Sequence, residues 1–434
     1  MVHQPNYDPS ELAISTLGSC EVLSPLPMSA APGDGIGNFT PDEARLLYEP
    51  RFLEGEQPPD LAFERAGARQ HLFFEPKEVK AAIVTCGGLC PGLNNVIRTL
   101  TFELIHNYGV EQVLGIRYGY HGLNPAVARP PIPLTCDFVG PIHHQGGTIL
   151  GTSRGHQDPK VTVDFLESEG INLLFCIGGD GTQRGAHAMA AEIQQRGLSI
   201  AIVCVPKTID NDIKFCYRTF GFYTAVAEAE QVIDRAHVEA KSVLNGVGLV
   251  KLMGREAGYI AAAATVASGE ANFCLIPEVP VEIDSFLEKL KRRLAAREHA
   301  VVVIAEGAGQ HWFPESDACD ASGNRKFNDS GIFLKQQIID FFAKEKLPVR
   351  VKYFDPSYHI RSLPAAPVDS LLCEQFARAA VHAGMAGKTD MFVGLWHNHL
   401  IHVPLSVSVG AVKQLSPEGE LWISVQALTG QEKW

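Results

Sequence analysis

The sequence lacks several common signals of location and of metal or redox chemistry. None of its 10 cysteines stands in C-x-x-C spacing with another, so a zinc ribbon or a thioredoxin-type redox centre has no support. No uninterrupted apolar run reaches the roughly 18 residues of a membrane span, and the start, M-V-H-Q-P-N-Y-D-P-S, has neither a basic segment nor an apolar core. We therefore expect a cytoplasmic protein without membrane association, whose cysteines are buried, reduced thiols.

Positive charge is scarce relative to negative charge. The 434 residues include 37 Lys and Arg against 49 Asp and Glu, a formal net charge of −12. This balance argues against nucleic acid as a partner, but it leaves room for a local basic pocket that binds a phosphorylated small molecule. An apolar fraction of 46% and a charged fraction of 20% are ordinary for a globular protein with a large core, and they argue against a disordered chain.

The chain divides into an N-terminal segment and a longer part with a regular pattern. Residues 24–41 are rich in Pro, Gly, Ser and Ala, which indicates an irregular extension, and residues 41–48 have the pattern of a short helix capped by Thr40. From residue 79 onwards, short apolar runs alternate with helical patterns. Strands are expected at 80–85, 112–117, 173–177, 200–205, 247–252, 273–276, 300–304 and 391–396, and helices at 93–108, 186–196, 223–243, 285–297 and 331–344. Strands that are apolar throughout indicate parallel sheets covered on both faces, so we predict two α/β units in tandem.

Two loops that follow expected strands are suited to phosphate chemistry, because ligands of open α/β sheets bind beyond the carboxyl ends of the strands. The first, Gly87-Gly-Leu-Cys-Pro-Gly-Leu-Asn94, precedes a helix whose N–H groups can bind phosphate; a tight turn needed only for packing explains it equally well. The second, Gly178-Gly-Asp-Gly-Thr182, places a carboxylate among glycines, which suits Mg²⁺ carried by nucleotide phosphates. The alternative is an Asp that caps the next helix.

A third loop, Pro206-Lys-Thr-Ile-Asp-Asn-Asp212, gathers two carboxylates and a lysine. Like charges and a nearby cation shift one another's pKa, which is typical of catalytic sites. One Asp can accept the proton of an attacking hydroxyl, and the Lys can balance charge on a transferring phosphate. The alternative is a solvated turn with local hydrogen bonds.

These three loops, together with Met253-Gly-Arg255, resemble the phosphofructokinase family over residues 79–410. The long, plant- and trypanosome-like ATP-dependent branch is most similar, on residues 85–94, 250–255, 305–309 and 352–361. The resemblance implies an α/β fold of two Rossmann-like, three-layer α/β/α lobes behind an extension of residues 1–78. The nucleotide-binding lobe would comprise residues 79–221 and 360–411, and the sugar-phosphate-binding lobe residues 222–359 and 412–434. A homodimer or homotetramer is also implied.

The family's residue roles, carried to the matching positions, imply an ATP-dependent 6-phosphofructokinase, a glycolytic kinase that transfers the γ-phosphate of ATP to the C1 hydroxyl of fructose 6-phosphate. Asp210 would accept the proton, Asp180 would be the ligand of Mg²⁺, and Lys207 and Arg255 would hold the migrating charge. The nucleotide is expected at Gly87, Tyr120, Arg154, Gly155, Gly178, Gly179, Asp180, Gly181 and Thr182. Fructose 6-phosphate is expected at Thr208, Ile209, Asp210, Asp212, Met253, Gly254, Arg255, Glu306, Lys352, Tyr358, His359, Ile360 and Arg361.

The phosphoryl donor depends on two positions. Gly181 favours ATP, because an Asp there would put bulk and negative charge where the α-phosphate of the nucleotide must pass. Lys207 is shared with pyrophosphate-dependent relatives, so a pyrophosphate-dependent enzyme is the first alternative. The others are a NAD or lipid kinase that shares the Gly-Gly-Asp-Gly-Thr string, and a catalytically inactive regulatory subunit, against which the presence of Asp180 and Asp210 argues.

Two further patterns are set aside. Gly387-Lys-Thr389 is similar to the end of a P-loop, but residue 382 is His where that motif needs Gly. His397, His399 and His402 have a spacing that cannot put all three on one face of a strand, so we expect no metal site there.

Overall fold

Contacts between residues divide the chain into two compact units, which we describe one at a time. The computed structural model describes residues 7–51, 54–55, 60–314 and 326–431. Unit 1 comprises residues 1–208, 213–220 and 364–411, and unit 2 comprises residues 209–212, 221–363 and 412–434. Within the described ranges, no helix is both long enough and apolar enough to cross a membrane.

Unit 1 is built on a nine-stranded sheet with the strand order β3-β4-β17-β16-β10-β9-β6-β7-β8. Its central strands run parallel to one another; they are β16 (Met391–Trp396), β10 (Ala201–Pro206), β9 (Leu173–Gly178), β6 (Lys80–Thr85) and β7 (Gln112–Ile116). The short edge strand β8 (Ile132–Pro133) is antiparallel to β7. Every residue of β9 and of β10 is buried, as in a sheet covered on both faces. The strands expected from the apolar runs in this half are therefore confirmed.

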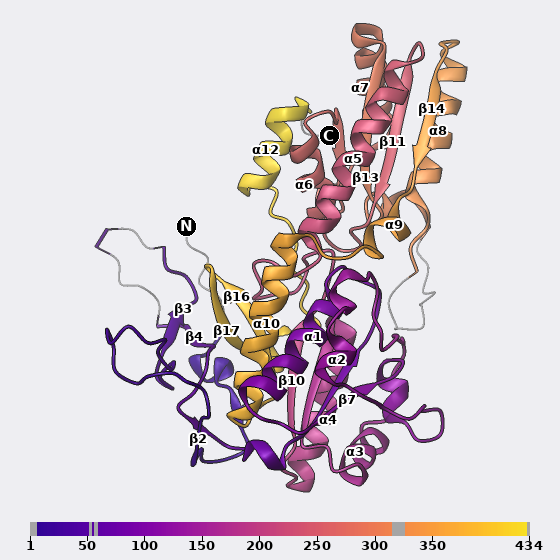
Figure 1. The fold of residues 1–434 in the computed structure, drawn as a ribbon. Helices are drawn as coiled ribbons and strands as arrows, with labels where there is room; N and C mark the ends of the chain where they lie inside the picture. The colour runs from indigo at the N-terminus through magenta and orange to yellow at the C-terminus, as the bar shows by residue number, and fades with distance from the viewer. Residues whose placement is uncertain (1–6, 52–53, 56–59, 315–325, 432–434) are drawn as a thin grey trace. The chain divides into compact units, whose positions relative to one another are not determined.

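Helices pack on this sheet along its parallel strands (Figure 1). The bounds are α1 (Leu93–Phe102), α2 (Cys136–Val139), α3 (Pro159–Ser168), α4 (Asp180–Arg196), α10 (Pro367–Met385) and α11 (Leu405–Ser408). Helix α10 packs against α1 and β10, while α4 contacts α3, β9 and β10. The expected start of α4 at residue 186 is wrong, because the helix begins at Asp180. Glycines at 181 and 185 weaken the local helical preference, but packing against the sheet overrides it.

The N-terminal segment adds strands to unit 1. Strand β4 (Ala62–Arg65) pairs with β17 (His399–Pro404) and with β3 (Arg45–Leu47), both antiparallel. Two smaller pairs join β1 (Ser15–Thr16) to β15 (Lys388–Thr389), and β2 (Val22–Leu23) to β5 (His71–Leu72). The short helix expected over residues 41–48 is wrong, since β3 lies in that range. A helix of this length is marginal alone, whereas the edge of a sheet offers hydrogen-bond partners to an extended chain.

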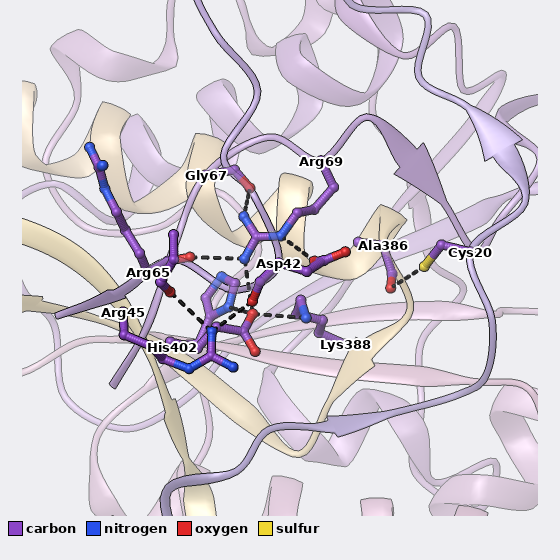
Figure 2. Close-up of polar contacts among 11 residues, drawn as sticks. Cys20, Asp42, Arg45, Arg65, Gly67, Arg69, Ala386, Lys388 and His402 are labelled. Carbon is purple, nitrogen blue, oxygen red and sulfur yellow. Dashed lines mark hydrogen bonds and ion pairs between the residues drawn. The ribbon is translucent and has the colours of Figure 1, made fainter. Parts of the chain in front are cut away.

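An ionic cluster, buried except for Asp42, links this segment to the sheet (Figure 2). We define the ionic cluster as Asp42, Glu64, Arg69, Lys388 and His402. Arg69 is only 3% exposed and donates to Asp42 Oδ1 at 2.8 Å and to Glu64 Oε1 at 2.9 Å. Lys388 Nζ and His402 Nδ1 also lie within 2.9 Å of Glu64 Oε1. Burial opposes ionisation of Glu64, but the hydrogen bonds and charges of His402 and Lys388 outweigh it and hold its pKa well below the usual range.

Unit 2 is built on a four-stranded parallel sheet in the order β12-β13-β11-β14. The bounds are β11 (Gly246–Leu252), β12 (Phe273–Leu275), β13 (His299–Ala305) and β14 (Arg350–Phe354). Helices α7 (Ile283–Arg297) and α8 (Ser330–Lys344) share a hydrophobic core with one face of the sheet. The close approach of Ala236 to Gly248 places α5 (Phe222–Lys241) on the other face, next to α6 (Tyr259–Ser268), on which α12 (Glu420–Thr429) packs (Figure 1). The predicted α/β class with parallel sheets is therefore confirmed.

Candidate active site

The loops expected to bind the nucleotide follow neighbouring parallel strands of unit 1. The loop of residues 87–94 follows β6, the loop of residues 178–182 follows β9, and Lys207 follows β10. These strands are adjacent in the sheet, and the carboxyl ends of parallel strands meet at one edge. Tertiary structure therefore brings together three motifs that are far apart in the sequence.

Lys207 forms hydrogen bonds with both glycine-rich loops. Its backbone N–H donates to the carbonyl of Gly178 at 3.0 Å, and its Nζ donates to the carbonyl of Gly88 at 2.7 Å. The side chain is 6% exposed. A Cβ on Gly87 would lie 3.2 Å from this Nζ, so the lysine lies directly against the first glycine loop. A buried cation held in this way sets a positive potential among loops suited to phosphate.

The loop of residues 152–155 lies beside Gly87. The N–H of Gly87 donates to the carbonyl of Ser153 at 3.0 Å, and Thr152 Oγ1 donates to the carbonyl of Gly87 at 2.7 Å. These bonds bring Arg154 and Gly155, both expected to bind the nucleotide, to the same edge of the sheet.

Asp180 is the first residue of α4, with Gly179 as the N-cap. Gly179 has no side chain that could cap the helix, and Asp180 lies one position further, inside the first turn. Oδ1 accepts from the N–H of Gly410 at 2.8 Å, and Oδ2 lies 2.8 Å from an Arg184 nitrogen. The carboxylate is 38% exposed. The alternative role as a helix cap is therefore not what this side chain does.

Asp180 suits a magnesium ion that arrives with phosphate. The described residues contain no group of three or more His, Cys, Asp or Glu side chains that could hold a metal ion. Mg²⁺ in nucleotide sites is commonly held by one or two carboxylates together with phosphate oxygens and water. A single, half-exposed carboxylate at a helix N-terminus fits that mode, and it does not fit a protein-only metal cage.

The glycine and tyrosine around Asp180 have clear packing roles. A Cβ on Gly178 would lie 2.1 Å from Thr182 Oγ1, so only glycine allows this close approach. Tyr120, in the 3₁₀ turn Gly119–Leu123 after β7, is buried and donates its hydroxyl to the carbonyl of Thr182 at 2.7 Å. Burial raises the pKa of Tyr120, so the phenol stays neutral. Its ring packs against Gly185 of α4, where a Cβ would lie 2.6 Å from the ring.

The residues expected to bind the sugar phosphate follow parallel strands of unit 2. Met253, Gly254 and Arg255 follow β11, and Glu306 follows β13. The two loops are joined, because Gly307 N–H donates to the carbonyl of Gly254 at 3.0 Å and Glu306 N–H donates to the carbonyl of Leu252 at 2.9 Å. Burial raises the pKa of Glu306, and the positive charges of Lys251 and Arg255 act against that rise.

Helix α9 (Ser357–Arg361) follows β14, the neighbour of β11. Tyr358 is 76% exposed, and the Arg361 guanidinium lies over its ring at 4.5 Å from the centroid. Ile360 is completely buried, backbone included. Lys352 lies within β14 instead of at its carboxyl end, and its Nζ is 3.5 Å from Glu239 on α5. The structure therefore sets Lys352 apart from the other residues expected at this edge.

The loop of residues 207–212 passes from unit 1 to unit 2 after Thr208. The carbonyl of Thr208 accepts from Thr219 Oγ1 at 2.7 Å. Ile209 is buried, and Asn211 has a positive φ of 57°. Asn tolerates this left-handed backbone better than most residues, and it turns the chain between the two aspartates. Asp210 is half-buried.

Three residues at these edges had no role in the sequence reasoning. Arg184 and Gly410 both contact Asp180. Lys251 is 2.8 Å from both Asp329 and Asp355; burial opposes its charge, but the two hydrogen bonds outweigh it and raise its pKa. The sequence does contain Lys251 beside the Met-Gly-Arg motif, but nothing local reveals its carboxylate partners.

Fold and loops together define an α/β protein with glycine-rich and basic loops at the carboxyl edges of parallel strands. A family model described as "Phosphofructokinase" matches residues 80–384, more than half of the chain. The chain belongs to the phosphofructokinase family.

Curated relatives extend this match. A protein of Borreliella burgdorferi named ATP-dependent 6-phosphofructokinase is 43% identical, over 97% of this chain and 97% of its own. A protein of the same name from Trypanosoma brucei brucei is 46% identical over 88% of this chain and 81% of its own. The ATP-dependent 6-phosphofructokinase 7 of Arabidopsis thaliana is 46% identical over 86% and 78%. The expected similarity to plant and trypanosome relatives is therefore confirmed.

A solved structure supports the fold. The pyrophosphate-dependent phosphofructokinase of Marinobacter aquaeolei superposes with a TM-score of 0.68 over 82% of this chain and 92% of that one. The sequence identity is 20%, so this likeness concerns the fold alone.

Proposed function

We propose that the protein is an ATP-dependent 6-phosphofructokinase, which converts fructose 6-phosphate and ATP to fructose 1,6-bisphosphate and ADP. The observation that carries this proposal is the second glycine loop. Asp180 stands at the start of α4, and next to it Gly181 is exposed, with nothing within 4 Å of a Cβ built there. That open space leaves room for a nucleotide, and relatives with 43% and 46% identity carry the same name.

Asp210 is the proposed general base. The C1 hydroxyl of the sugar attacks the γ-phosphorus in line, its proton passes to the Asp210 carboxylate, and the bond to the β,γ-bridging oxygen breaks to release ADP. A carboxylate with an ordinary pKa suffices when the proton is transferred late in a loose transition state. Lys207 and Arg255 balance the charge of the migrating phosphoryl group.

Asp180 is the residue that would hold Mg²⁺. The ion, when bound with ATP, neutralises charge on the β- and γ-phosphate oxygens. The protein itself orients the Asp180 carboxylate, because the Gly410 N–H contacts one of its oxygens and Arg184 contacts the other. Thr182 N–H donates to the carbonyl of Gly179, so the N–H groups of Asp180 and Gly181, which precede it, are the ones available to the phosphates, in keeping with anion binding at helix N-termini.

The acceptor sugar is proposed to bind at the carboxyl edge of the unit 2 sheet. Arg255 and Arg361 supply positive charge for its phosphate, and Glu306 supplies a hydrogen-bond acceptor for its hydroxyls. The remaining proposed contacts to the sugar phosphate are made by Met253, Gly254, Thr208, Ile209, Asp212, Tyr358, His359 and Ile360. Lys352, paired with Glu239, would contribute only after leaving that partner.

Pyrophosphate is the second candidate donor, and Lys207 is the observation that favours it. A coupled assay with fructose 6-phosphate, Mg²⁺ and either ATP or pyrophosphate separates the two. We expect turnover with ATP to exceed turnover with pyrophosphate. Faster turnover with pyrophosphate would overturn the ATP assignment, and activity on NAD without activity on fructose 6-phosphate would overturn the family's reaction for this chain.

We also propose that the protein works as a cytoplasmic homodimer or homotetramer. None of the nine cysteines in the described residues forms a disulfide, in keeping with a reducing compartment, whereas Cys319 lies outside those residues. Light scattering after size-exclusion chromatography measures the assembly, and a monomer that retains full activity would refute this part of the proposal.

A further inference from the structure

A short segment near the C-terminus makes hydrogen bonds to several loops of the candidate active site. It follows α11 and runs through residues 410–415, which we call the strap. Within the strap, the chain passes from unit 1 to unit 2 between Ala411 and Val412. The strap contains none of the sequence motifs that indicate function.

The first residue of the strap holds the proposed metal ligand. Gly410 N–H donates to Asp180 Oδ1 at 2.8 Å. Gly410 has a positive φ of 77°, a conformation that glycine adopts without strain. Helix α11 is fixed next to α4 because Ser408 Oγ bonds to Gln183 Oε1 at 3.1 Å, with both residues buried. The N–H that orients Asp180 therefore has a defined position.

The middle of the strap holds two loops of unit 2. Lys413 N–H donates to the carbonyl of Asp212 at 2.8 Å, at the end of the loop that carries Asp210. Gln414 Nε2 donates to the carbonyl of Glu256 at 3.2 Å, directly after the Met-Gly-Arg motif. Both carbonyls belong to loops proposed to bind the sugar phosphate.

The last residue of the strap is anchored by a half-buried carboxylate. Leu415 N–H donates to Glu278 Oε1 at 2.8 Å, and Gly258 N–H donates to the same oxygen at 2.9 Å. Leu415 is 3% exposed. The Tyr259 hydroxyl adds a bond to the carbonyl of Gln414 at 2.8 Å. One carboxylate thus joins the strap to the start of α6.

We propose that the strap is a positioning element for phosphoryl transfer: within unit 1 its Gly410 N–H orients the Asp180 carboxylate, and within unit 2 its Lys413 N–H supports the loop of Asp210. This inference rests on the proposed function. The reacting groups stand on loops from separate strands, and a misplacement of about 1 Å can cost about 100-fold in rate. Three of the bonds that the strap donates come from backbone N–H groups, which have no rotamer freedom. They are suited to fixing a loop, and no side-chain pattern in the sequence reveals them.

The test compares Gly410→Ala with a matched control, Gly197→Ala. Gly197 ends α4 with a φ of 66°, and for both glycines a Cβ would meet nothing within 4 Å. Both substitutions therefore impose a similar backbone strain, but only the first lies on the strap. For Gly410→Ala we expect kcat to fall about tenfold while the KM for fructose 6-phosphate stays within about twofold. Gly197→Ala should keep both constants near those of the wild type.

Amide hydrogen exchange without any substrate gives an independent measurement. In Gly410→Ala, the amides of Lys413 and Leu415 should exchange about tenfold faster than in the wild type, and in Gly197→Ala at the wild-type rate. Equal kcat and equal exchange rates for the two variants would overturn the proposal. A wild-type protein without activity on fructose 6-phosphate would count against the proposed function. Amide exchange requires no turnover, so the exchange rates would still test whether the strap fixes these loops.

A second pair of variants covers the case in which Gly410→Ala does not fold. Glu278→Ala removes the acceptor of the Leu415 N–H, whereas Glu278→Gln keeps an Oε1 that can accept it. We expect kcat to fall about tenfold in the first variant and to recover to within about threefold of the wild type in the second. Wild-type kcat in Glu278→Ala would refute the positioning role.

Discussion

The strongest test of donor choice is to replace Gly181 by Asp. Gly181 is exposed in the first turn of α4, and a Cβ there meets nothing within 4 Å. The backbone of this residue is not among those with positive φ, so a side chain causes no strain. Replacing a helical glycine gains up to about 1 kcal/mol in helix propensity, and a carboxylate near a helix N-terminus adds about 0.3–1 kcal/mol. The free energy of unfolding should therefore stay the same or increase slightly.

The same substitution should impair the use of ATP. Two unit negative charges about 6 Å apart repel by about 3 kcal/mol at an effective dielectric constant of about 20. If the α-phosphate of ATP passes this position, that energy lowers kcat/KM for ATP by about 100-fold. The measurement is the rate with varied ATP at saturating fructose 6-phosphate, together with the melting temperature of the variant.

Gly181→Asn is the matched control, because Asn has the shape of Asp without its charge. A loss in Gly181→Asp that far exceeds the loss in Gly181→Asn assigns the effect to charge. A Gly181→Asp variant that folds as stably as the wild type and keeps kcat/KM for ATP within about threefold would refute the argument from bulk and charge.

Three further outcomes are expected. Asp210→Asn should lower kcat by about 100- to 10,000-fold with little change in the melting temperature, and an unchanged rate would remove Asp210 from the mechanism. His382 is buried against Tyr108, and burial lowers its pKa to about 3. Between that value and the ordinary pKa of about 6.5, the unfolded chain binds a proton that the folded chain does not, so the free energy of unfolding should fall as pH falls, by up to about 1.4 kcal/mol per pH unit. Urea titrations at several pH values should show a shallower dependence for His382→Gln than for the wild type, and identical slopes would count against this reasoning. Arg69→Ala should cost about 1.5–3 kcal/mol of stability, because it removes the charged hydrogen bonds of Arg69 to Glu64 and Asp42 while Lys388 still pairs with Glu64. Arg51→Ala, at a side chain 83% exposed, should be close to neutral, and similar melting temperatures for both variants would contradict the importance of the ionic cluster.

Much of the secondary structure near the candidate site was predictable. Strands β9 and β10 are apolar runs that end in glycine or proline, and β6 is an apolar run followed by Gly87 and Gly88; such local signals require no knowledge of the rest of the chain. The start of α4 was misjudged because the glycines at 181 and 185 hide a helix that packing stabilises. Strand β3 was misjudged for a different reason, since its extended conformation depends on pairing with β4, which no pattern within residues 41–48 reveals.

The contacts between residues far apart in the chain could not be predicted from the sequence. Arg69 and Lys388 share Glu64, and no spacing rule connects residues so far apart. The hydrogen bond from the Gly410 N–H to Asp180 involves a backbone group that every residue other than proline possesses. The pattern of side chains in the sequence therefore cannot reveal this bond.

By itself, the sequence determined the α/β class, the family and the order of the motifs, because apolar periodicity and short glycine-rich strings are local properties of the chain. Only the tertiary structure decided that Asp180 begins a helix and that its carboxylate is held by Arg184 and Gly410. It also decided that Lys352, within β14, pairs with Glu239 on α5. These outcomes depend on which distant atoms the folded chain brings within hydrogen-bonding distance, and that is a property of packing.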